Sequence, residues 1–254
     1  MLSSISVVIP AYNEEKRLPV GLERVSEYLL GKGNTPAEIL VVNDGSTDAT
    51  GDVARSLAQR LERDGTSIRV LDNPGNRGKG YSVRHGMIKA RHDWVLFTDA
   101  DLSAPIEECD RLIDALDGGP YDVAIGSRAL DRSLIGVHQS GFRESMGRCF
   151  NLMVRLGAGL PFQDTQCGFK LFSRRAARAI FPRQQLERFG FDVEILYLAQ
   201  KLGFQVAEVP VRWNHCEGTK VGMLSGADAF LDVWRVRRND WLGKYNHHHP
   251  PPKE

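Results

Sequence analysis

The stretch WVLFTDADLSAP, residues 94–105, decides the expected fold, because an apolar run gives way within it to two carboxylates. The run at 94–98 is short and rich in β-branched and aromatic residues, which is typical of a strand buried on both faces. Asp99 and Asp101 follow it directly. Like charges this close repel each other, and burying either one is costly. The stretch therefore predicts a buried strand whose carboxyl end meets a positively charged partner.

Comparable apolar runs recur through the first half of the chain. They cover residues 5–9, 38–42, 67–71 and 122–126. Segments with apolar residues at helical spacing lie between them, at about 18–30, 48–63 and 80–91, and a further helix is expected after Pro105. Alternating strands and helices indicate an α/β fold with a doubly wound, mostly parallel sheet flanked by helices.

The second half of the chain is less regular. We expect helices at about 143–157 and 191–202 and a strand at 205–209. No internal repeat or low-complexity linker separates the two halves. We therefore expect a single domain over residues 1–243, whose two parts meet near residue 128, followed by a disordered tail at 244–254.

Composition narrows the classes of function. The net charge of the 254-residue chain is +1, which argues against a general nucleic-acid-binding protein. No apolar stretch reaches the roughly 18–20 residues that span a bilayer. The four cysteines are widely spaced and form no C-x-x-C pair, as expected for reduced thiols. We therefore expect a cytoplasmic protein, with peripheral contact to the cytoplasmic face of a membrane left open.

Polar residues follow three of the expected strands. The carboxyl ends of parallel strands, where such sheets bind ligands, carry PAYNEE (10–15), NDGSTD (43–48) and DADLS (99–103). Asp99 and Asp101 suit Mg²⁺ or Mn²⁺, which takes one or two carboxylates and leaves its other positions to water and phosphate oxygens. The alternative is that this pair caps the helix after Pro105. Asp44 suits a hydrogen bond to a ribose or a base, and its alternative role is an Asx turn.

The stretch NPGNRGKGYS, residues 73–82, is rich in glycine and cations. It offers backbone N–H groups, Arg77 and Lys79 to an anion. It is not a P-loop, because Asn73 and Gly80 stand where that motif needs Gly and Ser or Thr. The alternative is a loop of solvated charges.

Taken together, these motifs resemble a known family. VVIPAYNEE (7–15), VVNDGSTDAT (41–50), NRGKG (76–80) and TDADLS (98–103) are similar to the family 2 glycosyltransferases of GT-A fold. DTQCGFKLFSRRAA (164–177), FGFDVEILYLAQKLGF (189–204) and VAEVPVRWNHCEGTK (206–220) resemble the dolichyl-phosphate glucosyltransferases and the dolichol-phosphate mannosyltransferases. The resemblance covers about residues 4–222. Asn214 departs from it, since the mannosyltransferases have an arginine there.

The resemblance implies an inverting, metal-dependent hexosyltransferase. The donor would be a nucleotide-diphosphate sugar, UDP-glucose before GDP-mannose, and the acceptor a polyprenyl or dolichyl phosphate. Mg²⁺ or Mn²⁺ would be the cofactor. Residues 1–128 would then form the nucleotide-binding half of the domain, and 129–243 the acceptor half.

The resemblance also implies roles for individual residues. Asp99 and Asp101 would hold the metal, with Asp101 acting in catalysis through it. Asp164 lies where related enzymes place an active-site carboxylate, and its alternative role is a cap or an ion pair for nearby arginines. The nucleotide sugar would be bound by Pro10, Tyr12, Glu14, Asp44, Lys79, Asp99, Ala100, Arg128 and Lys220.

Two further functions stay open, together with the site of lipid docking. One keeps the donor and uses a soluble sugar or a small phosphorylated acceptor, and the other is a non-catalytic nucleotide-binding protein. A lipid would meet the basic amphipathic stretches at 142–157 and 222–245, whose sequences mix apolar residues with arginines at helical spacing. The alternative is that both apolar faces pack on the core.

Overall fold

The structure is a computed structural model that describes residues 3–62, 66–137, 153–155, 157–214 and 223–246, with the side chains of 223–230 left aside. The strands are β1 (Ile5–Ala11), β2 (Ala37–Asn43), β3 (Thr66–Asp72), β4 (Trp94–Thr98), β5 (Val123–Ser127), β6 (Ile135–Val137), β7 (Phe169–Ser173), β8 (Val206–Pro210) and β9 (Trp213–Asn214). The α-helices are α1 (Leu18–Leu30), α2 (Thr50–Leu61), α3 (Lys79–Lys89), α4 (Cys109–Asp117), α6 (Arg174–Ile180), α7 (Phe191–Lys201) and α8 (Met223–Trp241). Short 3₁₀ turns are η1 (Ile106–Glu108), η2 (Arg132–Leu134), η3 (Phe181–Arg183) and η4 (Lys244–Asn246).

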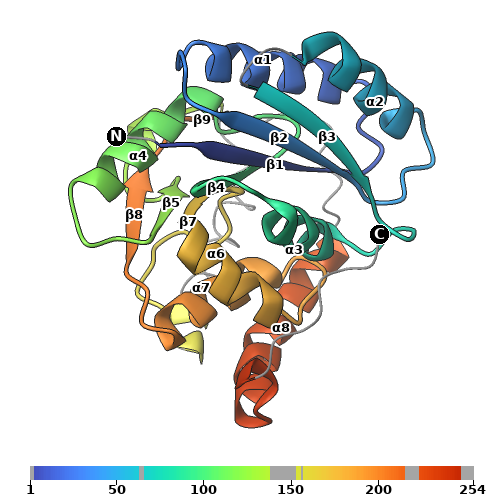
Figure 1. Ribbon diagram of the computed structural model, residues 1–254. Helices are drawn as coiled ribbons and strands as arrows, with labels where there is room; N and C mark the ends of the chain where they lie inside the picture. The colour runs from blue at the N-terminus through green and yellow to red at the C-terminus, as the bar shows by residue number, and fades with distance from the viewer. Residues whose placement is uncertain (1–2, 63–65, 138–152, 156, 215–222, 247–254) are drawn as a thin grey trace.

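A seven-stranded sheet in the order β3-β2-β1-β4-β7-β5-β8 forms the centre of the molecule. All of its pairings are parallel except those of β7, which runs antiparallel between β4 and β5. Figure 1 shows α1 and α2 over one face of the sheet and α3, α6 and α7 over the other. The expected α/β fold with a mostly parallel sheet and flanking helices is confirmed.

The strand pattern follows from having helices on both faces. Val7 and Ile9 of β1 belong to the core beneath α1 and α2, whereas Val8 between them belongs to the core beneath α3 and α7. Successive side chains of a strand point to opposite faces, so both sets must be apolar. This is why the five short apolar runs predicted the strands well.

Strand β7 is one of the elements that the sequence pattern does not predict, together with β6, β9 and α6. Its sequence is FKLFS, and Lys170 in its centre has no exposed surface. A lysine is rarely buried without a partner, so it argues against a buried strand when it is read alone. The partner, Asp192, comes from α7.

Two helix starts differ from the expected positions. The helix expected at 48–63 begins at Thr50, although Asp48 still accepts a hydrogen bond from the Thr50 backbone N–H at 3.0 Å. After Pro105 the chain makes the 3₁₀ turn η1 before α4 starts at Cys109. The helix expected over 143–157 lies mostly outside the described residues.

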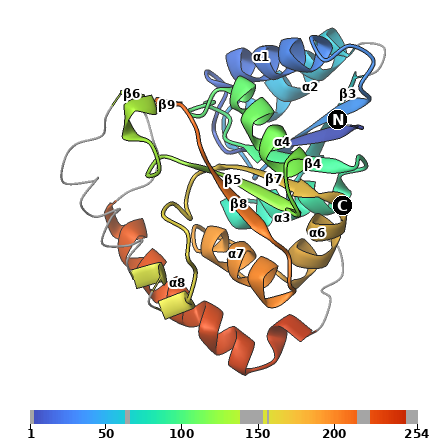
Figure 2. The same ribbon diagram turned by 90° about the vertical axis from the view of Figure 1, so that its left-hand side faces the viewer.

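The C-terminal segment packs on α7 rather than forming a tail from residue 244. Tyr245 in η4 is buried and donates a hydrogen bond to Glu194 Oε1 at 2.8 Å. The prediction of a disordered tail from residue 244 is therefore wrong for 244–246. Residues 247–254 lie outside the described residues. Figure 2 shows α8 at the rim of the molecule, on the far side of α7 from the sheet. No helix within the described ranges is long and apolar enough to cross a bilayer.

Glu194 predicts how the stability of the fold depends on pH. Burial raises its pKa from 4.5 to about 7, despite hydrogen bonds from two backbone N–H groups and Tyr245. The stabilisation that the bound proton provides is complete below about pH 4.5 and is lost as the pH rises through about 7. The loss amounts to about 3 kcal/mol.

We expect Glu194→Gln to remove this part of the pH dependence. Chemical denaturation between pH 5 and pH 8 should show a smaller fall in unfolding free energy than in the wild type. Glu27→Gln, at an exposed position of α1, should keep the wild-type slope. Equal slopes for Glu194→Gln and the wild type would contradict this assignment.

Candidate active site

The loops after β1, β2 and β4 meet at one edge of the sheet, because these strands are parallel neighbours. Hydrogen bonds join the first two loops. The backbone N–H of Asn13 donates to Ser46 Oγ at 3.0 Å, and that of Glu14 donates to Thr50 Oγ1 at 2.7 Å. The carboxyl edge is therefore a fixed platform.

Asp44 fixes the glycine-rich loop against this platform. Its buried carboxylate accepts hydrogen bonds from Asn73 Nδ2 at 2.8 Å, from the Arg77 N–H at 3.0 Å and from the Gly78 N–H at 2.8 Å. The neighbouring Asn43 side chain, rather than Asp44, accepts from the Ser46 N–H as an Asx turn does. The loop of 73–78 therefore has a defined place beside the strand ends.

Lys79 is the positive partner of Asp99. Its Nζ lies 2.6 Å from Asp99 Oδ1, where α3 begins. Burial lowers the pKa of Lys79, but the carboxylates of Asp99 and Asp192 raise it by more, so its net pKa lies above the ordinary value. An ammonium ion thus faces one of the two carboxylates that the sequence marks as metal ligands.

Asp101 turns back on its own loop. Its Oδ1 accepts from the Ser103 N–H at 3.0 Å, and its Oδ2 lies 3.8 Å from Arg17 Nη1. Arg17 also donates from Nε to Glu14 Oε2 at 2.6 Å. The first turn after Pro105 has no side-chain cap, so the structure does not support the helix-capping role.

Two glycines allow the turn that carries both aspartates. A Cβ on Gly168 would lie 2.2 Å from Asp99 Oδ2, and a Cβ on Gly21 would lie 2.5 Å from the Ala100 carbonyl oxygen. Leu102 takes up the turn with φ of +47°, a strained value for a side-chain-bearing residue. Asp99 and Asp101 are therefore held between α1 and the start of β7.

Arg128 and Asp164 form a two-pronged ion pair. Arg128 Nε and Nη2 lie 2.6 and 2.9 Å from the two Asp164 oxygens, and the Arg128 N–H adds a third bond at 3.0 Å. Burial raises the pKa of Asp164, but the Arg128 guanidinium lowers it by more, so the net pKa lies below the ordinary value. Asp164 is thus held as a carboxylate, and such a group is a weak base.

Lys170 and Asp192 were missed from the sequence. Lys170 Nζ contacts the Asp192 carboxylate and donates to the Cys167 carbonyl at 2.7 Å. Burial raises the pKa of Asp192 and outweighs the opposing effect of Lys170 and Lys79. The sequence feature that could have identified them is a charged residue inside an otherwise apolar stretch, as in FKLF and FDVEIL.

The remaining predicted residues fall at the same edge or outside the described chain. Pro10 is the second-last residue of β1, and Tyr12, just beyond the strand, is 37% exposed. Ala100 is buried between the two aspartates. Lys220 lies outside the described residues.

The donor set fits a divalent cation, although it is small. In the described part of the chain, no group of three or more Asp, Glu, His or Cys side chains is arranged to hold a metal ion. Asp99 and Asp101 supply two carboxylates on one turn, and Lys79 already places a positive charge on the first of them. Mg²⁺ commonly uses only one or two carboxylates and completes its shell with phosphate oxygens.

Comparisons with known proteins bear on the family and the fold. Residues 6–181 match the family model described as Glycosyl transferase family 2. The chain is 41% identical over 248 residues to a dolichyl-phosphate beta-glucosyltransferase of Drosophila melanogaster. The alignment covers 91% of this chain and 74% of the relative. A protein of the same name from Homo sapiens is 39% identical, with 85% and 69% covered, and one from Saccharomyces cerevisiae is 35% identical, with 95% and 76% covered.

Solved structures share the fold. Glucosyl-3-phosphoglycerate synthase from Mycobacterium tuberculosis, in complex with Mg²⁺ and UDP, gives a TM-score of 0.65 at 19% identity over 98% of this chain and 80% of that one. Mannosyl-3-phosphoglycerate synthase from Rubrobacter xylanophilus gives 0.68 at 16% identity over 99% and 78%. At these identities the likeness bears on the fold alone, and it confirms the expected GT-A type.

We expect Gly21→Ala to destabilise the protein through the turn of 99–102. The new methyl group would meet a backbone carbonyl, so the loop or α1 must shift, at a cost of about 1–3 kcal/mol. Gly31→Ala, at the C-cap of the same helix, is the matched control, since its Cβ would lie farther from a carbonyl oxygen, 3.3 Å from that of Tyr28. Thermal or urea unfolding measures both, and equal stabilities for the two variants would show that Gly21 does not hold the turn.

Proposed function

The chain belongs to glycosyl transferase family 2, and on that premise we propose that it moves glucose from UDP-glucose to a polyprenyl or dolichyl phosphate with inversion. The observation that carries the proposal is the pair Asp99 and Asp101, clamped at the carboxyl edge of the sheet beside Lys79. The names of the relatives support glucose as the sugar and a lipid phosphate as the acceptor. GDP-mannose stays the second candidate donor.

Asp99 and Asp101 would hold Mg²⁺ or Mn²⁺. When bound, the ion would supply Lewis-acid stabilisation of the diphosphate that leaves. The Mycobacterium tuberculosis synthase, which shares the fold, was crystallised with Mg²⁺ and UDP, and this supports a metal-assisted use of UDP-glucose here.

Lys79 serves the leaving group as well. Its ammonium lies 2.6 Å from Asp99 Oδ1, and Lys79 would turn from Asp99 to the diphosphate where that carboxylate holds a metal ion. The carboxylates around Lys79 keep it protonated for this task. A preorganised donor of this kind contributes on the order of 3 kcal/mol to transition-state stabilisation.

The nucleoside would lie over the loops after β1 and β2. Tyr12 is half exposed at this edge and can flank a base, and Pro10 and Glu14 border the same place. Asp44 shapes the pocket by fixing residues 73–78, and it remains the proposed acceptor for the base or ribose.

The acceptor needs little help to lose a proton. A phosphate monoester has a second pKa near 6, so it is largely dianionic at neutral pH. Asp164 is held by Arg128, and its lowered pKa suits positioning better than proton abstraction. We therefore assign Asp164 to holding Arg128 in place for a phosphate, with Lys220 as a further phosphate contact.

A soluble phosphorylated acceptor is the alternative that a structural likeness favours. Both phosphoglycerate synthases share the fold and, by their names, act on a small phosphorylated acid. The relatives of higher sequence identity carry names with a lipid phosphate, so the lipid acceptor comes first. Such an acceptor would bring the protein to a membrane surface.

A donor and acceptor panel tests the proposal. We expect transfer from UDP-glucose to a short-chain polyprenyl phosphate in the presence of Mn²⁺, and loss of transfer with a chelator. GDP-mannose should be used at least about tenfold less well, because a site built for one base leaves its polar groups unpaired with another. Transfer to 3-phosphoglycerate but not to the polyprenyl phosphate would contradict the lipid acceptor.

We expect Asp101→Asn and Asp164→Asn to fail in different ways. Asp101→Asn should lower kcat by about 100-fold or more, since it weakens stabilisation of the leaving group. Asp164→Asn should lower kcat/KM for the acceptor, yet keep a pH–rate profile that rises to a plateau above about pH 6 with the acceptor's own ionisation. If Asp164 were a general base, its ionisation would add a second rise to the wild-type pH–rate profile, and this rise would be lost in Asp164→Asn.

The profile is measured on folded protein, checked by circular dichroism. A profile of Asp164→Asn that loses its acid limb would assign proton abstraction to Asp164. Near-normal turnover of Asp101→Asn with Mg²⁺ would remove the metal role.

A further inference from the structure

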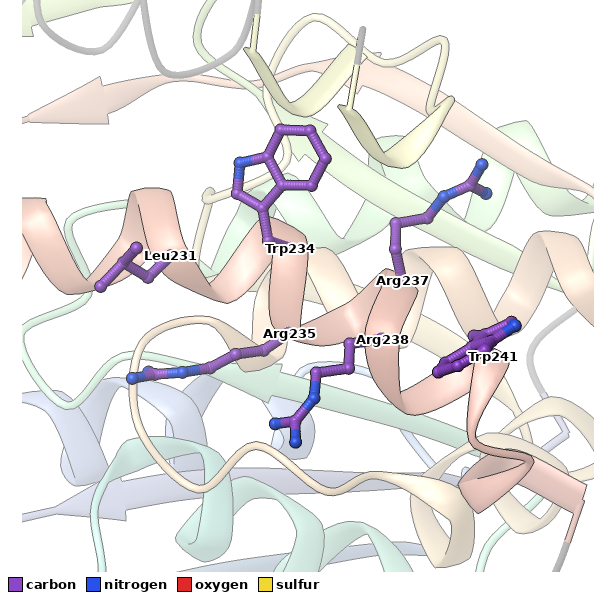
Figure 3. Close-up of a pocket in the computed structure, with 6 residues that line it drawn as sticks. All are labelled: Leu231, Trp234, Arg235, Arg237, Arg238 and Trp241. Atoms are coloured by element: carbon purple, nitrogen blue, oxygen red, sulfur yellow. The ribbon is translucent and has the colours of Figure 1, made fainter.

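The outer face of α8 exposes large apolar side chains that the fold does not use. Trp241 is 86% exposed, Trp234 66% and Leu231 55%. Three arginines, Arg235, Arg237 and Arg238, lie among them and line the same open hollow. Figure 3 shows Trp234 and Arg237 projecting to one side of the helix axis, Arg235 and Arg238 to the other, and Leu231 and Trp241 towards the two ends.

Helical spacing puts all six on one side of α8. At about 100° per residue, they fall within an arc of about 160°. We call this arc the outer face. The buried residues of the same segment, Val233, Val236 and Asn239, lie outside it and pack inward.

Contacts with α7 fix which face points outward. A Cβ on Gly190, at the start of α7, would lie 2.4 Å from Asp232 Cβ, so the two helices are in close contact there. At the other end Tyr197 Oη donates to Asp240 Oδ2 at 2.5 Å. The helix cannot roll to bury its tryptophans without breaking both contacts.

The charge of the outer face is positive. Arg235 pairs with Asp232 at 2.6 Å, and Arg237 lies 5.9 Å from the centre of the Tyr197 ring. No salt bridge to Arg238 occurs among the described residues. Tryptophan settles at the bilayer interface, and arginine binds anionic headgroups, so this combination is complementary to an anionic membrane.

We propose that the outer face of α8 docks the protein on an anionic membrane surface. This inference rests on the proposed function, whose acceptor lies in such a membrane. Asp232 on the inner side of α8 touches Gly190, two residues before Asp192, which acts electrostatically on Lys79. Docking through the outer face would therefore put the start of α7, which carries Asp192, directly behind α8.

Vesicle flotation of the full chain tests this surface. Vesicles of phosphatidylcholine with about 30% phosphatidylserine should carry the wild type with them at low salt. Binding should fall about tenfold in the double variant Trp234→Ser/Trp241→Ser. In Arg238→Glu it should fall about fivefold for each unit of positive charge that is removed. Salt at 0.5 M should weaken the binding of the wild type to these vesicles.

The control variants make the same kinds of substitution at exposed positions on other helices. Val20→Ser removes an exposed apolar side chain from α1, and Arg178→Glu reverses an exposed charge on α6. Both should float like the wild type. Equal loss in these controls, or full binding by the double tryptophan variant, would overturn the proposal.

A second copy of this chain is the competing occupant. Light scattering that shows a dimer of the wild type, a monomer of the double tryptophan variant and no flotation of either would overturn membrane docking.

Transfer assays separate this inference from the proposed function. With a water-soluble, short-chain polyprenyl phosphate, the double tryptophan variant should match the wild type, while its transfer to a long-chain acceptor in vesicles should fall about tenfold. Flotation without any transfer by the wild type would support the docking surface and defeat the proposed acceptor. Transfer to the vesicle acceptor that is unchanged in the double variant would defeat the docking surface alone.

Discussion

Carboxylates gathered at one edge of a sheet must be neutralised, and much of the second half of the chain is arranged to meet that constraint. Lys79 faces Asp99, Arg128 grips Asp164, and Lys170 pairs with Asp192. Each pair joins segments distant in sequence. Removing Arg128 or Lys170 would leave a buried carboxylate without its partner, which costs far more than the pair itself contributes. The site is therefore charged and yet stable before any ligand arrives.

Strand β7 shows how this constraint shapes the fold. It enters the sheet antiparallel between β4 and β5, carrying Lys170 into the core and Gly168 against Asp99. A parallel sheet alone would end at β4 with its aspartates open on one side. The inserted strand closes that side. Helix α7 contributes two buried carboxyl groups, those of Asp192 and Glu194.

Local patterns in the sequence predicted the strands buried on both faces, the helices between them and the aspartates at the strand ends. Resemblance to a family supplied Arg128 and Asp164, and the alternative of an ion pair between Asp164 and a nearby arginine did not identify Arg128 as the partner. β7, Lys170 and Asp192 escaped prediction because a charge in an apolar run makes sense only with its distant partner. The start of α2 at Thr50, the turn η1 before α4 and the burial of Tyr245 also escaped the sequence analysis.

The central claim is that Lys79 holds the place of a divalent cation on Asp99. A crystal structure of the full chain with Mn²⁺ and UDP, with anomalous diffraction locating the metal, tests it most directly. We expect Mn²⁺ at Asp99 and Asp101 beside the diphosphate, with Lys79 Nζ moved from Asp99 to a phosphate oxygen. An anomalous peak elsewhere, or UDP bound while Lys79 still pairs with Asp99, would contradict it.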